Sequence, residues 1–198
     1  MNNFSQTAGG VGIGLSDWEG YAKPLSRKLS YVNTFFHQEP FLDITNPIGK
    51  DFEKYDFIIA SDVFEHVPPP SLSAFEGAYK LLKPDGILIL TVPFTNEDNT
   101  QKHFPDLGEY QIVNFKNREY ILVNQNSDGE FNTYKDLVFH GGPGTTLEMR
   151  VFCRKDLTAK MQETGFQNIQ YFDSDVAEYG ILHKVNWSLP VTALKPEQ

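Results

Sequence analysis

The chain has 198 residues, of which 40% are apolar and 14% aromatic, and its formal net charge is −9. This size and apolar content predict one folded domain over residues 1–198 and exclude a disordered chain. The negative charge argues against general binding to DNA or RNA, which depends on a cationic surface that displaces counterions from phosphates. No nucleic-acid partner is therefore expected.

The chain contains a single cysteine, Cys153, which excludes a disulfide framework within it and zinc sites built on several cysteines. Such cysteine usage is typical of the reducing cytoplasm. Residues 1–18 have neither a basic segment nor a long apolar one, so they do not have the pattern of a signal peptide. No apolar run approaches the ~18 residues that a membrane span needs. We expect a cytoplasmic protein without membrane contact.

The N-terminal part of the chain predicts strands around one weak helix. Residues 10–15, GVGIGL, are apolar and glycine-rich, as in a buried strand or its exit loop. Ser16 or Asp17 could cap a helix after this strand. Gly20 and Pro24 lower the helix propensity, so we expect this helix to be short or broken. Two further strands are predicted from their β-branched and aromatic content, at residues 30–36 and 40–44.

The middle of the chain has the pattern of a strand–helix–strand unit. Residues 55–60, YDFIIA, are an apolar run of buried-strand length, and residues 86–94, GILILTVPF, are a second one. Between them, apolar side chains recur at helical spacing: Leu72, Phe75, Tyr79 and Leu82. The segment Pro84-Asp85-Gly86 ends this helix in a turn. Apolar strands joined by a helix indicate a parallel sheet that is covered on both faces.

The second half of the chain predicts an antiparallel insertion, over about residues 95–150, and then a return to the main sheet. Residues 109–115 and 118–125 predict a hairpin connected at Lys116-Asn117. A helix is predicted over residues 153–166, with Leu157, Met161 and Phe166 toward the core and Gly165 at its end. The remaining strands are predicted at residues 134–140, 168–173 and 180–189.

Residues 55–94 resemble the second half of a class I S-adenosylmethionine-dependent methyltransferase domain. In that family a buried strand ends near a D-V-x-E-H-V segment, and a helix ending in L-L-K-P-G-G precedes the next strand. Here the segments read DVFEHV and LLKPDG, with Asp85 in place of the first glycine. The wider runs GIGLSDWEGYA, NTFFHQEPFLDI, KHFPDL and FHGGPGTTLEMRVF are similar to a subgroup of uncharacterised methyltransferases over nearly the whole chain. Some of those carry a cysteine-rich segment ahead of the similar part, which this chain lacks.

The resemblance implies an α/β fold with a Rossmann-like class I methyltransferase sheet and a small antiparallel β insertion after the family's fifth strand. It also implies S-adenosyl-L-methionine as the cofactor, bound at the carboxyl ends of the strands, where ligands of open α/β sheets lie. The residues implied to bind it are Gly12, Gly14, Ser16, Asp43, Ile44, Ser61 and Asp62.

Each of these residue types suits a part of the cofactor. Glycines let the backbone come close to the methionine part. The Asp43 carboxylate would accept a hydrogen bond from the adenine amino group, and Ile44 would pack on the adenine face. Ser61 and Asp62 stand where the family places the sulfonium end.

Three histidines are candidate catalytic residues: His66, His103 and His140. A hydroxyl acceptor needs a base, and an imidazole titrates near neutral pH. The alternatives are that His66 braces the loop after its strand and that the other two are solvent or core histidines. The three show no metal-ligand spacing, so no metal site is predicted.

Three charged residues near the candidate site are expected to be structural. Glu65 would accept backbone N–H groups in the proline-rich turn that follows it. Glu148 and Arg150 alternate with apolar residues, as in a half-buried strand, and we expect them to form salt bridges.

The sequence therefore predicts a methyltransferase that acts on a small molecule or sugar, with O-methylation as the favoured reaction and the insertion as lid or acceptor shelf. The alternative is a methyltransferase-like binding or partner module without catalysis. Two features favour that alternative: the first strand is short, and residues 30–36 do not end in the acid that usually contacts the ribose. A nicotinamide-linked oxidoreductase is less favoured, because no acid follows the glycine cluster at a strand end about twenty residues on.

Overall fold

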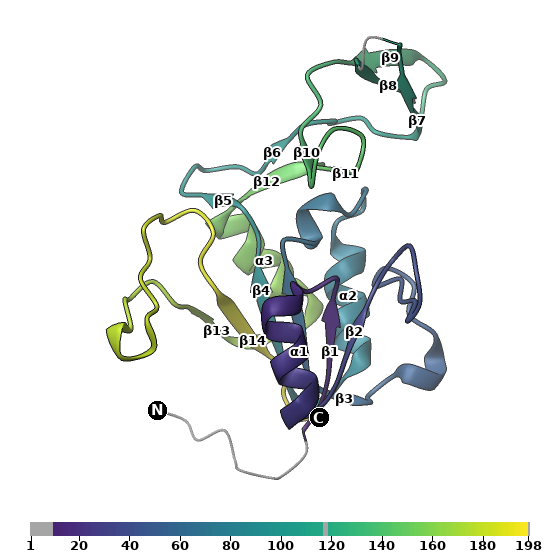
Figure 1. The fold of residues 1–198 in the computed structure, drawn as a ribbon. Helices are drawn as coiled ribbons and strands as arrows, with labels where there is room; N and C mark the ends of the chain where they lie inside the picture. Colours follow the sequence, from purple (N-terminus) through teal and green to yellow (C-terminus); the bar gives the residue numbers. More distant parts are fainter. Residues whose placement is uncertain (1–9, 117–118, 198) are drawn as a thin grey trace.

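A six-stranded sheet forms the centre of the computed structural model, which describes residues 10–116 and 119–197 (Figure 1). The strand order is β13-β14-β4-β3-β1-β2. The strands are β1 (Val11–Leu15), β2 (Ser30–Thr34), β3 (Tyr55–Ser61), β4 (Leu82–Thr91), β13 (Gln167–Tyr171) and β14 (Val191–Leu194). The first four pair in parallel, and β14 is antiparallel to both β4 and β13. The predicted α/β fold is confirmed.

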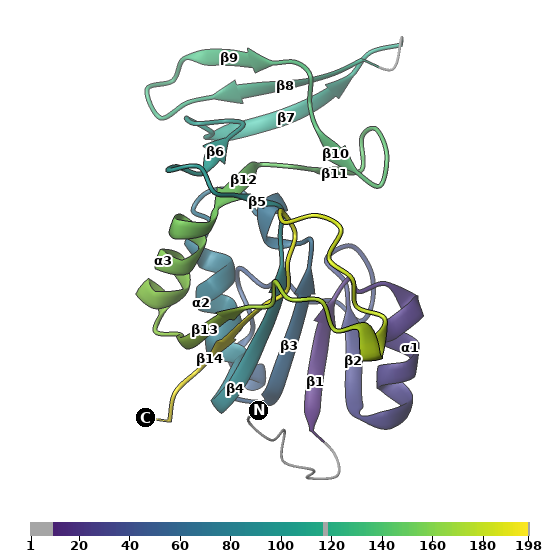
Figure 2. The ribbon, with the colours of Figure 1, turned by 90° about the vertical axis from the view of Figure 1, so that its left-hand side faces the viewer.

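Alternate residues of β3 pack on opposite faces of this sheet. Ile58 and Ala60 are fully buried in the main core, which α2 (Leu72–Leu81) and α3 (Arg154–Thr164) complete. Phe57 packs on the other face, in a smaller cluster that includes Ala22 of α1 (Glu19–Lys28). Figure 2 shows α2 and α3 beside each other and α1 on the far side of the strands. Both faces of the sheet are therefore covered, as continuous apolar strands require.

The glycines of β1 lie under aromatic side chains of the chain itself. A Cβ added at Gly12 would lie 2.1 Å from the Phe57 ring, and one at Gly14 would lie 1.9 Å from the Tyr31 hydroxyl. The rings of Phe57 and Tyr31 stack with their centroids 6.2 Å apart. The glycine-rich pattern of this strand is thus explained by packing on the face toward α1.

The insertion stands above the carboxyl edge of the parallel strands (Figures 1 and 2). It contains the antiparallel sheet β7-β8-β9 and parts of two smaller sheets, β5-β12-β6 and β10-β11. These strands are β5 (Phe94–Thr95), β6 (Gln101–Lys102), β7 (Glu109–Asn114), β8 (Tyr120–Gln125), β9 (Phe131–Tyr134), β10 (Phe139–His140), β11 (Thr146–Leu147) and β12 (Arg150–Cys153). A separate apolar cluster holds them together: Phe104, Leu122, Leu147 and Met149.

Three short 3-10 turns complete the described elements: η1 (Gly49–Asp51), η2 (Phe64–His66) and η3 (Ala177–Tyr179). η2 follows β3 almost directly, and α2 begins only at Leu72, after the prolines at 68–70. The exit from β3 is therefore a compact turn rather than the start of the helix. None of the helices in the described ranges is long and apolar enough to cross a membrane.

Several predicted elements are present. The strands at 10–15, 30–36, 55–60 and 86–94 correspond to β1 to β4, although β4 already begins at Leu82. The hairpin is β7-β8, but part of its predicted turn, Asn117, lies outside the described residues, as do residues 1–9. The helix at 153–166 is α3, and Gly165 ends it with φ 108°.

Three predicted strands are wrong in whole or in part. Residues 40–44 form no strand; Phe41 makes only an isolated bridge to Phe35. Residues 180–189 form none either, and the last strand is β14. The strand predicted at 134–140 is two, because β9 ends at Tyr134 and β10 begins at Phe139. Short apolar runs specify burial but no pairing partner, which explains these errors.

The first helix also differs from its prediction. α1 runs unbroken over ten residues with Pro24 inside it, and its N-cap is Trp18 rather than Ser16 or Asp17. Pro24 removes one N–H donor in the middle of the helix, and the packing of Ala22 and Leu25 on β2 and β3 offsets that loss. The Asp17 side chain is used elsewhere, as described below.

Gly77 offers a test of how α2 packs on the segment that follows β2. Helix propensity alone predicts that Gly77→Ala stabilises the protein by about 1 kcal/mol. In the structure, the added Cβ would lie 1.7 Å from the Ile44 carbonyl oxygen. We therefore expect Gly77→Ala to lower the free energy of unfolding by about 1–3 kcal/mol. Urea denaturation measures this, with exposed Glu76→Ala on the same helix as the control; a stabilised Gly77→Ala protein would refute the packing.

Candidate functional site

The chain leaves β1 and β3 through residues with left-handed backbone. Ser16 follows β1 with φ 58°, and Asp62 follows β3 with φ 52°. Their N–H groups are held by the neighbouring strands: Ser16 donates to the Thr34 carbonyl at 2.7 Å and Asp62 to the Thr91 carbonyl at 2.9 Å. Non-glycine residues in this conformation are uncommon and concentrate at functional sites. The two exits lie at the same edge of the sheet, because β1 and β3 are adjacent and parallel.

Asp17 anchors the loop that follows β1. Its buried carboxylate accepts hydrogen bonds from the hydroxyls of Tyr31 and of Tyr21, the latter at 2.8 Å. Burial raises the pKa of Asp17, and the two tyrosine hydrogen bonds partly offset that rise. Its backbone is paired with the Asn33 amide, which accepts from the Asp17 N–H at 2.9 Å and donates to the Asp17 carbonyl at 2.8 Å. The loop after β1 is thereby fixed to β2.

Asp43 and Ile44 lie in the turn after β2. One oxygen of Asp43, Oδ1, accepts from both the N–H and the hydroxyl of Thr45, at 2.9 and 2.7 Å. The Ile44 side chain belongs to the main core and is 6% exposed. The structure thus gives Ile44 a packing role, while Asp43 holds its own turn through one of its two oxygens.

Ser61 and Asp62 end β3. The Ser61 hydroxyl lies 2.8 Å from that of Thr91 on β4. Burial raises the pKa of Asp62, and the nearby His140 and a hydrogen bond with Thr91 pull it back down. His140 thus affects the pKa of Asp62 electrostatically, while its ion pairs are with Glu65 and Glu148.

Glu65 is the most unusual residue of this region. Its side chain is fully buried, and neither carboxylate oxygen has a hydrogen-bond partner among the described residues. Burial raises the pKa of Glu65 to about 8; its own backbone N–H partly offsets this, and the carboxylates of Asp62 and Glu148 add to it. A buried carboxylate without a partner is costly, so its presence requires an explanation.

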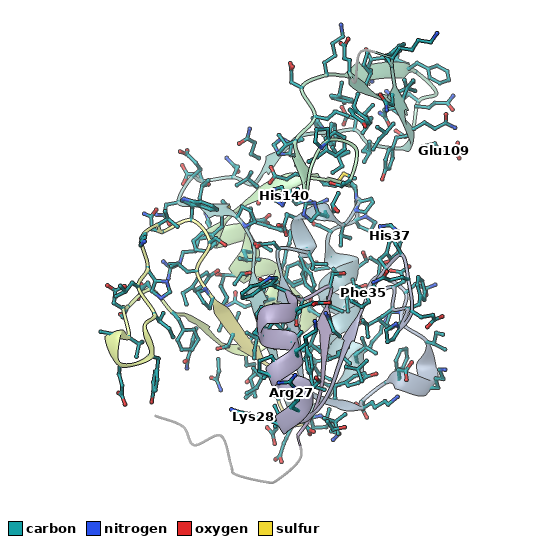
Figure 3. All side chains as sticks on the ribbon, viewed as in Figure 1. Arg27, Lys28, Phe35, His37, Glu109 and His140 are labelled. Carbon is teal, nitrogen blue, oxygen red and sulfur yellow. The ribbon has the colours of Figure 1, made fainter. Side chains whose placement is uncertain are left out.

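Two imidazoles adjoin this carboxylate. His66 Nε2 lies 3.6 Å from Glu65 Oε1, and His140 Nδ1 lies 3.8 Å from the same atom. The rings of His66 and His140 meet edge to face with centroids 4.6 Å apart. Figure 3 labels His140 where the insertion meets the upper edge of the sheet, whereas Arg27 and Lys28 lie at the opposite edge. The histidines predicted at 66 and 140 are thus brought together at the carboxyl edge.

The other nitrogen of each ring is held by the protein. His66 Nδ1 lies 2.8 Å from the Leu147 carbonyl, and His140 Nε2 lies 2.9 Å from Glu148 Oε2. Burial lowers the pKa of His66, which favours its neutral form. His103 does not reach Glu65: its Nε2 binds Glu148 Oε1 at 2.7 Å. His103 therefore positions Glu148, which in turn positions His140.

Arg150 supplies the buried positive charge of this region. It donates from Nη1 to the Phe64 carbonyl at 3.2 Å, and burial lowers its pKa to about 10 while Glu65 opposes that change. The expected salt bridges are found only in part. Glu148 contacts His103 and His140 rather than Arg150, and Glu65 accepts none of the backbone N–H groups of the proline turn.

A hollow of about 320 Å³ opens between the start of α2, the insertion and α3. Its lining includes Lys102, Arg150 and Lys160 but none of the residues predicted to bind cofactor or to catalyse. We therefore assign the site to the carboxyl edge, where the left-handed exits and the histidines meet, and not to this hollow.

A family model described as a methyltransferase domain matches residues 11–171. The chain belongs to this methyltransferase family. No curated protein sequence matches the chain significantly. The matched region contains β1 to β13, and so includes both strand exits, η2 and the whole insertion.

Solved methyltransferases share the fold at low sequence identity. CurJ carbon methyltransferase superposes with a TM-score of 0.58 at 14% identity, over 97% of this chain and 50% of its own. The 1,6-didemethyltoxoflavin-N1-methyltransferase of Burkholderia thailandensis, solved with S-adenosylhomocysteine, gives 0.54 at 13% identity, over 96% of this chain and 72% of its own. An S-adenosylmethionine-dependent methyltransferase from Mesorhizobium loti gives 0.54 at 11% identity, over 94% and 92%.

These similarities concern the fold. This chain spans about half the length of the CurJ carbon methyltransferase chain that it matches. The names of the first two structures specify different methylated atoms, carbon in one and nitrogen in the other. The fold therefore leaves the acceptor open.

Sequence reasoning missed the partners that hold the site. Tyr31 and Asn33, which fix the loop after β1, look like ordinary strand residues in the sequence. Glu148 looks like a half-buried strand residue, yet it binds two histidines. The only local signal was the alternation of charged and apolar residues at 147–151, which indicates that Glu148 and Arg150 share one face.

Asn33 tests how the loop after β1 is held. Removing its amide in Asn33→Ala leaves the Asp17 N–H and carbonyl without these partners, so we expect the free energy of unfolding to fall by about 1–2 kcal/mol. Hydrogen exchange should also become faster at residues 16–18. The control is Ser30→Ala, at the exposed start of the same strand. Unchanged exchange in this loop would contradict the assigned role.

Proposed function

We propose that this methyltransferase transfers the methyl group of S-adenosyl-L-methionine to a hydroxyl of a small molecule, such as a sugar. The observation that carries the proposal is the meeting of two features at one sheet edge. The left-handed exits of β1 and β3, at Ser16 and Asp62, lie at the carboxyl edge of the sheet, and a group of imidazoles and carboxylates on η2 and the insertion lies above the end of β3 (Figure 1). The first feature suits the cofactor, and the second suits an acceptor that must lose a proton.

The residues at the exits fit the cofactor. Ser16 adopts the left-handed conformation that a tight loop after β1 needs, and Asp17 and Asn33 hold that loop in place. Asp43 keeps Oδ2 free of the contacts that occupy Oδ1, so this oxygen can accept from an adenine amino group. Ser61 and Asp62 would border the sulfonium end. Gly12 and Gly14 lie within β1, paired with β2 and β3 and covered by aromatic side chains, so they would act on the cofactor only by shaping the strand that leads to Ser16. When bound, the cofactor supplies an electrophilic methyl group.

The site departs from the family pattern at the ribose. Residues 35–38, which follow β2, contain no acid, and the Asn33 amide is already used by Asp17. Ribose hydroxyls would therefore be bound by His37 or Glu39 of this segment, by backbone groups or by a residue from another segment. This departure is the observation that favours the second candidate function, a methyltransferase-like module that binds a partner without catalysis.

The acceptor would bind between Asp62 and the underside of the insertion. Oxygen becomes a good nucleophile only when its proton leaves as the bond to the methyl carbon forms. Among the described residues, His66 and His140 each keep one ring nitrogen without a hydrogen-bond partner at that place. These nitrogens can act on the acceptor by taking its proton or by holding an ion that lowers the pKa of its hydroxyl. His103 would act indirectly, by positioning Glu148, which in turn holds His140.

A small acceptor in the cytoplasm agrees with the rest of the chain. Cys153 is free and buried, as a reducing compartment permits. The net charge of −9 is unsuited to general nucleic-acid binding.

Cofactor binding can be tested at Asp43 without disturbing its turn. In Asp43→Asn the side-chain oxygen can still accept from Thr45, but the other position becomes an N–H donor that faces the adenine amino group. We expect affinity for S-adenosylhomocysteine, measured by calorimetry, to fall about 10–100-fold, as for the loss of a hydrogen bond to a charged group. Asp128→Asn, in an exposed hairpin turn, is the control.

The same calorimetry separates the two candidate functions. The wild-type protein should bind S-adenosylmethionine and S-adenosylhomocysteine. If neither binds at millimolar concentration, the enzyme proposal fails and the partner module becomes the better account.

His140 separates the acceptor side from the cofactor side. We expect His140→Ala to lower the rate of S-adenosylhomocysteine formation by about 10²–10⁴-fold, the usual contribution of a group that assists proton transfer. Cofactor affinity should stay within twofold, since the residue lies on the insertion. The assay screens hydroxylated small molecules, sugars included, with wild type and variant in parallel. Equal rates would remove His140 from the mechanism.

A further inference from the structure

Glu65, His66 and His140 present three possible metal-ligand atoms to one another. Glu65 Oε1 is 3.6 Å from His66 Nε2 and 3.8 Å from His140 Nδ1, and all three ligand atoms lie within 4.8 Å of each other. Metal–ligand bonds of about 2.0–2.2 Å at tetrahedral angles separate ligand atoms by roughly 3.4 Å. Small side-chain rotations would therefore bring the three atoms to the spacing that an ion imposes.

In each imidazole, the ring nitrogen farther from Glu65 is already hydrogen-bonded, as it is in metal sites. A metal-ligating histidine usually donates its second ring N–H to a carbonyl or carboxylate, which fixes the tautomer and ring orientation. Here the Leu147 carbonyl is the partner of His66 Nδ1, and the Glu148 carboxylate is the partner of His140 Nε2. Both rings are thus set with a lone pair on the inner nitrogen, toward Glu65. His103 binds the second oxygen of Glu148 and so fixes that carboxylate in turn.

The charged groups around Glu65 favour the binding of a cation. Glu65 is fully buried and neither of its oxygens has a hydrogen-bond partner among the described residues. Asp62, Glu65 and Glu148 place three carboxyl groups near one buried guanidinium, that of Arg150, so acidic groups outnumber the cation by two. A divalent ion would cancel this excess and give the Glu65 carboxylate the partner that it lacks.

We propose that Glu65, His66 and His140 bind one divalent first-row transition-metal ion. Two imidazoles and one carboxylate are a donor set for ions such as Zn²⁺, Co²⁺ or Mn²⁺, whereas Mg²⁺ prefers oxygen ligands. Three protein ligands also leave coordination positions open for a water or an acceptor oxygen.

The role of the ion rests on the proposed function, although its binding does not. An acceptor hydroxyl bound to the ion would lose its proton to solvent at a lower pH than in free solution. Its oxygen would then form the bond to the methyl carbon, while the carbon–sulfur bond breaks and its electron pair stays on sulfur. The products are the methylated acceptor, the neutral thioether and the released proton.

The test measures ion binding directly, on the full chain without a histidine tag. After removal of metal with a chelator, equilibrium dialysis against Zn²⁺, Co²⁺ or Mg²⁺ gives stoichiometry and affinity, and visible absorption reports Co²⁺ ligation. We expect one Zn²⁺ or Co²⁺ per chain and much weaker Mg²⁺ binding. Glu65→Gln and His140→Ala should each weaken Co²⁺ binding at least tenfold and change its spectrum. His103→Ala should weaken it less, because His103 acts through Glu148.

The controls are His37→Ala and His183→Ala, which should bind as wild type does. His140 is partly exposed on the insertion, so its variant remains informative if Glu65→Gln is poorly folded. Thermal unfolding gives a second readout for Glu65→Gln. Its metal-free Tm should equal or exceed that of metal-free wild type, while Zn²⁺ at one fixed concentration should raise the wild-type Tm more than that of the variant.

Two outcomes would overturn the proposal. One is the absence of stoichiometric Zn²⁺ and Co²⁺ binding by wild type. The other is binding that persists in both Glu65→Gln and His140→Ala. Neither measurement involves cofactor or acceptor. A failure to bind metal is therefore distinct from a failure to bind S-adenosylhomocysteine, and only the latter would contradict the proposed function.

Discussion

The site depends on the contact between η2 and the segment that returns from the insertion. Three hydrogen bonds make this contact: the Met149 N–H donates to the Glu65 carbonyl, His66 binds the Leu147 carbonyl, and Arg150 donates to the Phe64 carbonyl. Residues about eighty positions apart are thus joined, and the insertion is fixed above the end of β3. Without this contact Glu65 would reach water, and His140 would have no defined position relative to Asp62.

The sequence predicted the elements whose burial repeats regularly. β3, α2 and β4 have continuous or 3.6-residue apolar patterns, because a doubly covered sheet buries both faces of its strands. The pattern failed where an apolar run is short and its partner is far away in the chain. Residues 40–44 and 180–189 have the composition of strands, but backbone pairing depends on which edge is free to accept them, and no local pattern contains that information.

The site was predicted in part, for a similar reason. The candidate residues after β1 and β3 follow from chain order, since parallel strands end at one edge. His66 and His140 were proposed separately, and only the fold shows that they share a carboxylate. Glu65 was expected to hold a turn because sequence cannot distinguish a carboxylate that accepts backbone N–H groups from one that is buried beside two imidazoles. His103 was placed with the other two, but its ring binds Glu148 instead.

The two halves of the candidate site meet different physical demands, and under the proposed function this would bear on how an acceptor is selected. The β1 loop is fixed by buried hydrogen bonds among Asp17, Tyr31 and Asn33, so it presents one rigid backbone shape to any ligand. The side that is proposed to bind the acceptor contains a buried Glu65 carboxyl group whose lost hydration no described residue replaces with a hydrogen bond. A ligand that brings positive charge recovers that cost on binding, and a neutral apolar one does not. Acceptor choice should therefore follow from the charge and proton balance beneath the insertion more than from the cofactor cleft.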